Sequence, residues 1–362
     1  MIKYKQVSKG REYMLTFLIM AGGSGERFWP LSTKQKPKQL LKIFDEKSLI
    51  RLAYERVLPL VDKNQIFIAT NAIQVPALKE DLCELEDSRI IIEPAFRDTA
   101  SAIAYGSMMI SKYYDNPTIC VLASDHLISN PEEFRNVIKL AEAEANKNNI
   151  VTLGIKPTYP EIGYGYIQVE NGQLNLPEKS LGFKEKPKYD VALEYYNSGK
   201  YLWNSGMFIF KYDVIMDALK THSSNHYDTI NKISPLFDKN EGVKTAELVK
   251  QTFELFEKKS IDFAVMENAS NIIVIPSSFG WNDVGSYKAF EELFDADENG
   301  NITNNTVLIS VDSNNNIIVS NDKCQRVSLL GVSNTIIAIT KDEILVLSKD
   351  KCQEIKKIIS KI

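Results

Sequence analysis

A glycine-rich loop followed by cations is the first feature of this sequence that could do chemistry. Residues 18–41 read LIMAGGSGERFWPLSTKQKPKQLL, in which an apolar, strand-like run leads into a loop and then into Arg27 and Lys38. The loop comprises Ala21, Gly22, Gly23, Ser24 and Gly25. Glycine lets backbone N–H groups approach an anion, Arg binds phosphate oxygens with a planar fork, and Lys adds a mobile charge. The stretch predicts a phosphate-binding loop, although alone it also fits a strand-to-helix turn with solvated basic residues.

Two standard nucleotide motifs and a targeting signal do not fit this stretch. The Gly-Lys-Ser/Thr of a Walker loop is absent, and Phe28 stands where a dinucleotide fingerprint needs its third glycine. The apolar run 14–21 is short for a signal peptide, and no small-residue cleavage pattern follows it. The cations Arg27 and Lys38 are therefore what distinguishes the loop.

Two aspartates are candidates for holding a divalent cation. Asp125 follows the strand-like run CVLAS, which ends in Ser124, and Asp283 lies in FGWNDVGS. A carboxylate at a strand end suits a hard cation such as Mg²⁺, which takes few protein ligands and several phosphate oxygens. Taken singly, each aspartate is more often a cap or turn residue.

A carboxylate and a helix start lie together in IIEPAFRDTASAIAYG. Glu93 ends a strand-like run, and a helix of small residues is expected from Thr99. The Glu93 carboxylate could accept hydrogen bonds from guanine N1–H and its amino group, which adenine does not offer in that arrangement. Read alone, the stretch favours a plain helix start beside an Arg97–Asp98 pair.

Three further stretches combine unusual residues. EIGYGYIQV interrupts a strand pattern with Gly163, which favours close approach by a ligand or another backbone. GFKEKPK places Glu185 and Lys186 before a proline, in an extended conformation. YLWNSGMFIF holds Asn204 between aromatics, a pattern suited to sugar hydroxyls. Each alone is more often core or turn than site.

The elements that must position these residues alternate between strand-like and helical patterns over residues 15–298. The apolar runs are FLIMA, QIFIAT, RIIIEP, TICVLAS and IVTLGI. Helical patterns lie between them at 48–60, 99–114 and 130–146, the last with an Asn-Pro-Glu-Glu start. This alternation predicts an α/β fold: a mainly parallel sheet with helices on both faces and ligands at the carboxyl ends of its strands.

The last part of the chain has a different pattern. Short strand-like pieces between turn residues predict a small all-β unit over 299–362, closed by an amphipathic helix at 349–362. Residues 1–14 are expected to be an N-terminal extension. The DADENG stretch opens like a calcium-binding loop, but Thr306 stands where the loop needs its last glutamate, so a polar linker is predicted.

Composition excludes several classes of function. With 362 residues, 44% hydrophobic and 25% charged, the chain can bury a substantial core. A net charge of -4 argues against a nucleic-acid partner, and no stretch approaches the roughly 20 apolar residues of a membrane span. The four cysteines lack metal-type spacing and are expected to be reduced thiols.

Together these stretches resemble the sugar-1-phosphate nucleotidyltransferases, and specifically the mannose-1-phosphate guanylyltransferases, or GDP-mannose pyrophosphorylases. The motifs occur in the family's order: AGGSGERFWP, KPKQ, EPAFRDTA, SDH, TLGIKPTYPEIGYGYI, FKEKP, WNSGMF, SIDFAVME and WNDVG. The resemblance implies a Rossmann-like, mixed but mostly parallel sheet flanked by helices, of the nucleotidyltransferase or glycosyltransferase-A type. The tail is similar to the family's small, β-helix-like C-terminal unit. Without the phosphomannose-isomerase domain of longer bacterial forms, a monofunctional enzyme is expected.

The resemblance also implies an activity and a role for each candidate residue. The guanylyl group of GTP is transferred to α-D-mannose 1-phosphate, giving GDP-mannose and pyrophosphate, with Mg²⁺ as cofactor. The implied catalytic residues are Arg27, Lys38 and Lys186, and the implied metal ligands are Asp125 and Asp283. The implied nucleotide-binding residues are Ala21, Gly22, Gly23, Ser24, Gly25, Glu93, Thr99 and Ser124. The implied sugar-phosphate-binding residues are Gly163, Glu185 and Asn204.

Alternatives remain at the level of the substrate. Asp98, Ser101 and Ala123 depart from the usual family pattern, as does the pair at 161–162, and they lie beside the expected base and sugar sites. A guanylyltransferase for another manno-configured sugar 1-phosphate, such as a heptose, is therefore the alternative. A glycosyltransferase is disfavoured because the Asp-x-Asp triplet at 295–297 lies in the predicted linker. The protein is expected in the cytoplasm, without nucleic-acid or membrane partners, and as a homodimer by resemblance.

Overall fold

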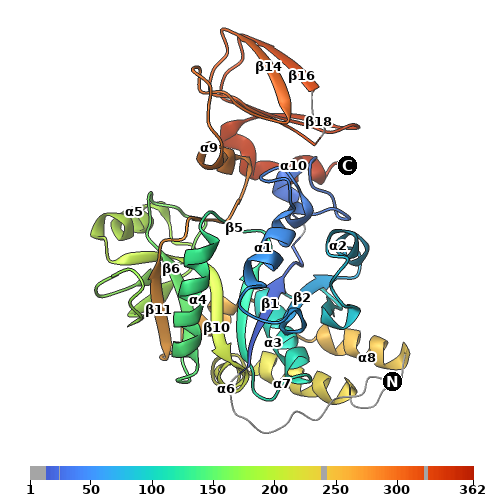
Figure 1. Cartoon of the computed structure of the whole chain (residues 1–362), viewed down its shortest axis with the longest axis vertical. Coiled ribbons are helices and arrows are strands. Elements are labelled where there is room, and N and C mark those ends of the chain that lie inside the picture. Colours follow the sequence, from blue (N-terminus) through green and yellow to red (C-terminus); the bar gives the residue numbers. More distant parts are fainter. Residues whose placement is uncertain (1–13, 24, 238–242, 322–324) are drawn as a thin grey trace.

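The computed structural model describes residues 14–23, 25–237, 243–321 and 325–362. Ser24, Cys324 and all but the last residue of the predicted N-terminal extension lie outside the described residues. A large sheet with flanking helices forms one end of the molecule, and a smaller β region forms the other (Figure 1). Short helical segments, among them α9 (Phe290–Leu293) and α10 (Lys356–Ile359), lie between them (Figure 1).

The described residues form a ten-stranded sheet of mixed direction, with the strand order β3-β2-β1-β4-β10-β6-β11-β8 and with β7 and β9 attached beside β10. Strands β1, β2, β3, β4, β6 and β11 all run the same way, and β10 is inserted antiparallel between β4 and β6. The expected mixed, mostly parallel sheet is thus confirmed. The strands are β1 (Leu15–Met20), β2 (Ile66–Asn71), β3 (Ile90–Glu93), β4 (Thr118–Ala123), β6 (Ile150–Ile155), β7 (Tyr166–Gln168), β8 (Glu178–Lys179), β9 (Gly182–Lys184), β10 (Tyr201–Lys211) and β11 (Ile272–Ser277).

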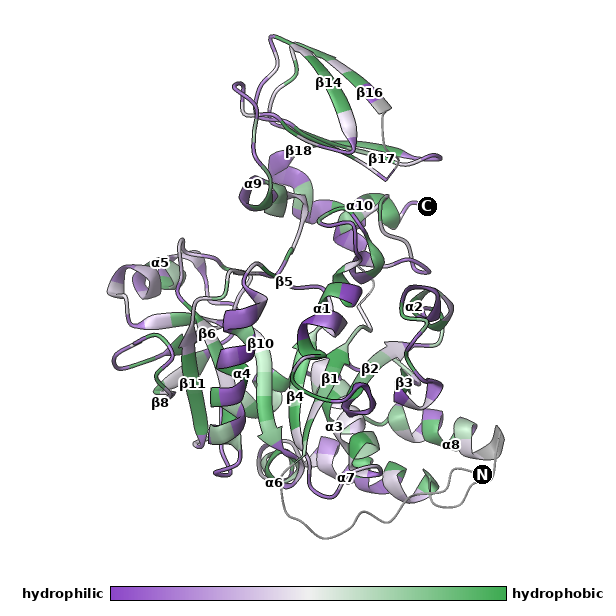
Figure 2. Ribbon diagram, viewed as in Figure 1, coloured by the Kyte–Doolittle hydropathy of each residue, from purple (hydrophilic) through white to green (hydrophobic). Residues whose placement is uncertain are grey.

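Helices cover both faces of this sheet, as the alternation predicted. On one face pack α3 (Asp98–Ser111), α6 (Tyr212–His222), α7 (Ser224–Ile233) and α8 (Val243–Phe253); on the other pack α1 (Leu49–Val57), α2 (Val75–Asp81) and α4 (Pro131–Ala145). Successive residues of β1 alternate between the two cores, with Leu18 in one and Phe17 and Ile19 in the other. Figure 2 shows the apolar strands enclosed by helices whose outer faces are polar. Helix α5 (Tyr189–Ser198) lies beside β10.

Local capping explains where two of the helices begin. The Ser48 side chain accepts a hydrogen bond from the Arg51 N–H at the start of α1. The Asn130 side chain accepts one from the Glu133 N–H at the start of α4, and Pro131 follows in the first turn. Both helix starts were predicted to within one residue.

Most strand pairs of the C-terminal β region are parallel, as a β-helix-like stack requires, whereas its last strand pairs antiparallel with its neighbour. Strands β13, β15, β17 and β18 form one sheet and β14 and β16 form another, with β13–β15, β15–β17 and β14–β16 all parallel. The strands are β13 (Ile302–Asn304), β14 (Thr306–Val311), β15 (Ile317–Ser320), β16 (Gln325–Leu330), β17 (Thr335–Ile339) and β18 (Ile344–Ser348). The DADENG stretch is a turn in which the Asp297 side chain accepts the N–H groups of Asn299 and Asn301.

The predicted closing helix is corrected by the structure. Residues 349–362 form a 3-10 segment, η8 (Lys349–Glu354), and the short α10 instead of one amphipathic helix. Cys352 and Ile355 are buried, whereas Ile358 is 40% and Ile362 is 80% exposed. Ile359 also packs against this core, so the apolar contact continues into α10 and ends before Ile362.

One hydrophobic core joins the two ends of the molecule. Phe28 and Leu31, which follow the glycine loop, pack in the same cluster as Tyr287, Ile336 and Ile355. The Tyr287 hydroxyl donates to the backbone carbonyl of Phe28 at 2.9 Å. The C-terminal region is thereby attached to the segment that contains the predicted phosphate loop.

In the part of the chain that the structure describes, no helix combines the length and hydropathy needed to cross a membrane. Cys83, Cys120 and Cys352 are free thiols, as expected.

Candidate active site

Two cavities lie at the carboxyl edge of the large sheet. One, of about 560 Å³, is lined by the glycine loop, Lys38 and Asp125. The other, of about 890 Å³, is lined by Lys186 and Asp283. Arg27 lines both cavities, so they adjoin at that side chain. The predicted catalytic and metal residues therefore face a shared region; of the predicted sugar residues, Gly163 lines the larger cavity, and Glu185 and Asn204 line neither.

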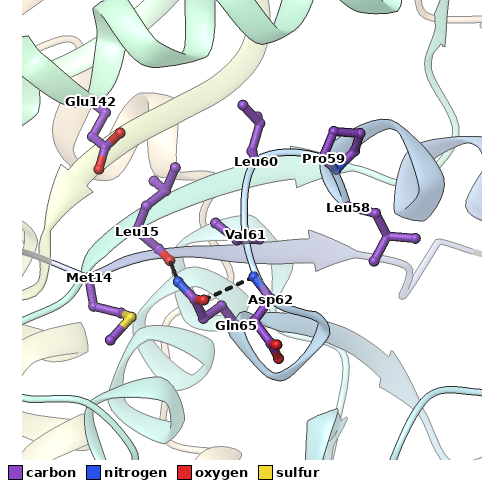
Figure 3. Close-up of a pocket in the computed structure, with 9 residues that line it drawn as sticks. All are labelled: Met14, Leu15, Leu58, Pro59, Leu60, Val61, Asp62, Gln65 and Glu142. Atoms are coloured by element: carbon purple, nitrogen blue, oxygen red, sulfur yellow. Dashed lines mark hydrogen bonds between the residues drawn. The ribbon is translucent and has the colours of Figure 1, made fainter.

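A further hollow lies at the opposite edge of the sheet. It surrounds the amino end of β1, where Gln65 Nε2 donates to the Leu15 carbonyl at 2.6 Å (Figure 3). None of the predicted site residues lines it. Since parallel strands direct ligands to their carboxyl ends, we place the site at the other edge.

The glycine loop requires glycine at one position and is tight at a second. Gly25 has a φ of 63°, and a Cβ there would lie 2.5 Å from the Lys38 backbone nitrogen. A Cβ on Gly22 would lie 3.2 Å from Glu93 Oε1. Ala21 continues the sheet, because its N–H donates to the Ala69 carbonyl at 2.7 Å.

Buried amide side chains hold the carbonyls of this loop from the protein side. Gln39 Nε2 donates to the Ala21 carbonyl at 2.7 Å, and Gln74 Nε2 donates to the Gly23 carbonyl at 3.1 Å. The two glutamines also bond to each other at 3.1 Å, and both are buried. With these acceptors occupied from behind, the face toward the cavity favours an anion. Neither glutamine was among the predicted site residues; the presence of Gln39 in KPKQ was the available signal.

Lys38 links the two aspartates that were predicted to hold a cation. Its Nζ lies 2.9 Å from Asp125 Oδ2 and donates to the Asp283 backbone carbonyl at 2.7 Å. The Lys38 side chain is 7% exposed and that of Asp125 is 35% exposed. Burial alone would raise the pKa of the Asp125 carboxyl, but the neighbouring ammonium of Lys38 outweighs it and lowers that pKa. Asp125 is therefore a carboxylate at neutral pH.

A pair of short strands aligns the segments that carry these aspartates. Strand β5 (Leu127–Ile128) pairs antiparallel with β12 (Trp281–Asn282). Trp281 Nε1 donates to His126 Nδ1 at 3.1 Å across this pair. The Asp283 carboxylate itself accepts the Tyr164 hydroxyl at 2.7 Å. These contacts hold Asp283 on the same side of the cleft as Asp125, whose neighbour Ser124 is buried at the end of β4.

Glu93 lies against Gly22 of the glycine loop, and Thr99 lies in the first turn of α3. Burial raises the pKa of the Glu93 carboxyl to about 7. The Thr99 hydroxyl accepts a hydrogen bond from the Ile261 N–H at 2.9 Å, which ties the start of α3 to the segment before the π-helix Asp262–Met266. A partly buried carboxyl beside Gly22 is suited to a ligand that brings its own N–H donors.

Two of the predicted sugar residues, Glu185 and Asn204, meet around a second cluster of carboxyls. Asn204 Nδ2 donates to Asp262 Oδ1 at 3.0 Å, and Glu185 is 7% exposed, with Oε2 lacking a hydrogen-bond partner among the described residues. Burial and the neighbouring Glu185 raise the pKa of the Asp262 carboxyl to about 6. Gly165 lies directly against Glu185 and Asn204, where any Cβ would clash. Gly163 was predicted for this site, whereas Asp262 was not; the available signal for Asp262 was its place in SIDFAVME.

Lys186 and Gly163 lie at the mouth of the larger cavity. The Lys186 ammonium pairs with the Glu185 carboxylate and is 62% exposed. The Gly163 N–H donates to the Glu161 carboxylate at 2.6 Å, so Gly163 shapes its own exposed loop. Of the two, Lys186 is the one that contacts the Glu185 cluster.

Two family models match successive parts of this chain. The family model described as nucleotidyl transferase matches residues 16–300, and the one described as the MannoseP isomerase/GMP-like beta-helix domain matches residues 306–362. The alginate biosynthesis protein AlgA of Pseudomonas putida is 36% identical over 91% of this chain and 67% of its own length. The mannose-1-phosphate guanylyltransferase RfbM of Salmonella typhimurium is 36% identical over 94% of this chain and 71% of its own length.

A solved structure has the same fold over almost the whole chain. It is described as a mannose-1-phosphate geranyltransferase from Thermus thermophilus, and it is 31% identical, with a TM-score of 0.84. The likeness covers 96% of this chain and 98% of that one. The family expected from the motifs is thus confirmed: the chain belongs to the nucleotidyl transferase family.

Proposed function

We propose that this enzyme transfers the guanylyl group of GTP to α-D-mannose 1-phosphate, giving GDP-mannose and pyrophosphate. The observation that carries the proposal is the row of sites along one sheet edge. Glu93 lies beside the glycine loop, the loop beside the Lys38–Asp125 pair, and Lys186 beside the Glu185–Asn204 cluster. This order matches base, triphosphate and sugar phosphate. The relatives named as mannose-1-phosphate guanylyltransferases support mannose over another manno-configured sugar.

The reaction requires alignment and charge neutralisation more than proton transfer. An oxygen of the sugar phosphate bonds to the α-phosphorus of GTP, and the bond from that phosphorus to the bridging oxygen breaks. The bond's electron pair stays on the departing pyrophosphate. Because the attacking phosphate monoester is already ionised near neutral pH, no general base is needed.

The chain's own cations are placed for this task. Arg27 lines both cavities, so it can contact the triphosphate and the pyrophosphate as it leaves. Lys186, 62% exposed, is available to the sugar phosphate once that anion competes with Glu185. Lys38 is held by Asp125 and the Asp283 carbonyl, and these contacts position its ammonium group between the carboxylates and the loop.

Asp125 and Asp283 have the donor set expected of Mg²⁺ ligands. Both are aspartates at the carboxyl edge of the sheet. No group of three or more His, Cys, Asp or Glu side chains suited to a metal occurs among the described residues, so a cation here would have only these two protein ligands. Two carboxylates fit a hard cation that takes its other ligands from phosphate oxygens and water. When bound, Mg²⁺ supplies charge neutralisation at the phosphates.

The Glu185 cluster is suited to mannose hydroxyls. Among the described residues Oε2 of Glu185 has no hydrogen-bond donor, so it can accept one from a ligand, and Asp262, with its raised pKa, changes protonation near pH 6. A sugar hydroxyl can donate to Glu185 and accept from Asn204 at the same time. Such paired contacts discriminate between sugars that differ in configuration at the ring carbon carrying that hydroxyl.

A pyrophosphate-release panel tests the proposal. Four nucleoside triphosphates are combined with mannose, glucose and heptose 1-phosphates, with and without Mg²⁺. We expect the highest kcat/KM for GTP with mannose 1-phosphate, and turnover only with a divalent cation. Faster turnover with dTTP or UTP and glucose 1-phosphate would contradict the assignment, and a preference for the heptose would select the alternative substrate.

Two further expectations accompany the proposal. The cytoplasm supplies GTP, so we place the enzyme there. A homodimer is also proposed, and light scattering of the purified protein measures it.

A further inference from the structure

The C-terminal segment lies next to the glycine loop, on the side of the loop that faces away from the large sheet. Cys352 and Ile355 are buried in the same core as Phe28, and α10 contacts the short helix η1 (Glu26–Phe28) that follows the loop. Figure 1 shows α10 against the blue segment that follows β1. A segment more than 300 residues away in sequence thus forms a wall of the phosphate cavity, where Lys356 lines it together with Gly22 and Gly23.

The polar contacts across this boundary are weak and face the cavity. Lys356 Nζ lies 3.2 Å from Glu26 Oε2, with the lysine side chain 66% and the glutamate side chain 35% exposed. Arg27 Nη1 donates to Gln353 Oε1 at 3.5 Å. Exposed ion pairs of this kind contribute little to stability, so the lysine can exchange Glu26 for a stronger anion.

The cations beside the glycine loop do not neutralise all of the negative charge of a bound triphosphate. Lys38 is engaged with Asp125, and a triphosphate with one Mg²⁺ still carries about two negative charges. Arg27 can balance one of them. Lys356 is a further cation that lines the same cavity.

We propose that Lys356 is a ligand of the nucleotide's β- and γ-phosphates and of the pyrophosphate that leaves. The C-terminal segment then supplies a binding group to the active site, in addition to packing against it. In the free enzyme Glu26 holds the ammonium at the rim of the cavity; when the polyanion enters, the ammonium moves from one carboxylate to several phosphate oxygens. The inference rests on the proposed function, because it takes a nucleoside triphosphate as the cavity's ligand.

The next residue provides a matched control. Lys357 lies on the same short helix and is 77% exposed, but it pairs with Glu354 and does not line the cavity. Lys356→Gln and Lys357→Gln therefore remove the same charge from neighbouring positions, and any effect of net charge alone is the same in both.

The experiment measures binding of Mg²⁺-pyrophosphate by calorimetry and the KM values for both substrates. We expect Lys356→Gln to weaken pyrophosphate binding and raise the KM for GTP by about tenfold, the scale of one charge-assisted contact. The KM for mannose 1-phosphate and the Tm should stay unchanged, Lys356→Arg should restore most of the affinity, and Lys357→Gln should resemble the wild type.

The Glu26→Gln variant distinguishes a phosphate-binding role of Lys356 from a purely structural one. If Lys356 binds phosphate, freeing it from Glu26 leaves pyrophosphate affinity equal or higher. Equal losses of Tm in Lys356→Gln and Glu26→Gln, with pyrophosphate affinity unchanged, would overturn the inference. So would equal phosphate binding by the Lys356→Gln and Lys357→Gln variants.

The two proposals fail in different ways. If the wild type turns over GTP and mannose 1-phosphate while Lys356→Gln binds pyrophosphate normally, only the inference is wrong. If the wild type binds pyrophosphate through Lys356 but accepts another sugar phosphate, only the substrate assignment is wrong.

Discussion

At the scale of single residues, the two aspartates differ in what they hold. Asp125 uses its carboxylate to pair with the buried Lys38, whereas Asp283 contacts Lys38 through its backbone carbonyl. A change to asparagine therefore removes an ion pair only at Asp125. The metal-binding role proposed for both and the structural role of one can be separated by measurement.

Asp125→Asn and Asp283→Asn should each lower kcat by about a hundredfold or more, because asparagine lacks the charge that retains Mg²⁺ among competing phosphate oxygens. Asp125→Asn should also lower the free energy of unfolding by about 1 kcal/mol, since its carboxylate is partly exposed, and Asp283→Asn should not. Turnover at saturating Mg²⁺ and chemical denaturation measure the two effects. Near-wild-type turnover in both variants would remove the metal site from the proposal.

The Glu93 carboxyl predicts a pH dependence of nucleotide affinity. Its pKa is raised by burial from an ordinary 4.5 to about 7, so near neutral pH the free enzyme carries this proton in a large fraction of molecules. Guanine N–H donors favour the carboxylate, so GTP binding below pH 7 releases a proton and weakens up to about tenfold per unit of falling pH. The same raised pKa affects folding: the contribution of Glu93 to stability is fully present below pH 4.5 and is lost as pH rises through about 7.

Calorimetry of GTP binding between pH 5.5 and 8.5, in buffers of different ionisation enthalpy, measures the affinity and the proton release. Glu93→Gln should bind GTP more weakly than the wild type at high pH. Its GTP affinity should also change less with pH, because the variant has no carboxyl group at this position. A wild type and variant with parallel pH profiles would show that Glu93 does not face the base.

At the scale of elements, the position of the glycine loop depends on residues from two other segments. Gln39 lies in the 3-10 turn η2 (Lys38–Leu40), and Gln74 lies just before α2. Both direct amide groups at carbonyls of a loop that has no regular structure of its own. The loop therefore depends on long-range hydrogen bonds for the orientation of its N–H groups.

Gln74→Met should raise the KM for GTP several-fold and destabilise the fold by about 1–3 kcal/mol, because the Gly23 carbonyl loses a buried donor. Gln65→Met is the matched control: Gln65 holds the Leu15 carbonyl at the opposite edge of the sheet (Figure 3). It should also destabilise the fold but leave the KM for GTP unchanged. Equal KM values in the two variants would mean that the Gln74 contact does not shape the site.

At the scale of the whole molecule, the C-terminal β region and the catalytic sheet are not independent. The core around Phe28, Tyr287 and Ile355 contains residues from the loop segment, the segment after the second aspartate and the tail. Three parts of the active site therefore share one packed cluster. Substitutions in the β region are expected to affect phosphate binding through this core, and the proposed contact of Lys356 is the most direct case.

The sequence by itself determined the local elements and the family. Apolar runs bounded by turn residues predicted β1, β2, β3, β4 and β6, a helical pattern predicted α1, and the Asn-Pro-Glu-Glu sequence predicted the start of α4. The ordered motifs predicted the nucleotidyl transferase family, which the comparisons confirmed. These properties depend on neighbours within a few positions or on short motifs, and both can be read along the chain.

Tertiary structure alone decided the rest. The antiparallel insertion of β10, the burial of Gln39 and Gln74, the approach of Asp262 to Asn204 and the contact of Lys356 with Glu26 all join residues far apart in sequence. A glutamine or a lysine has no local pattern that distinguishes a buried carbonyl donor or a cavity wall from a solvated side chain. That distinction is made by which elements pack together, because packing determines which polar groups lose water and must find a partner.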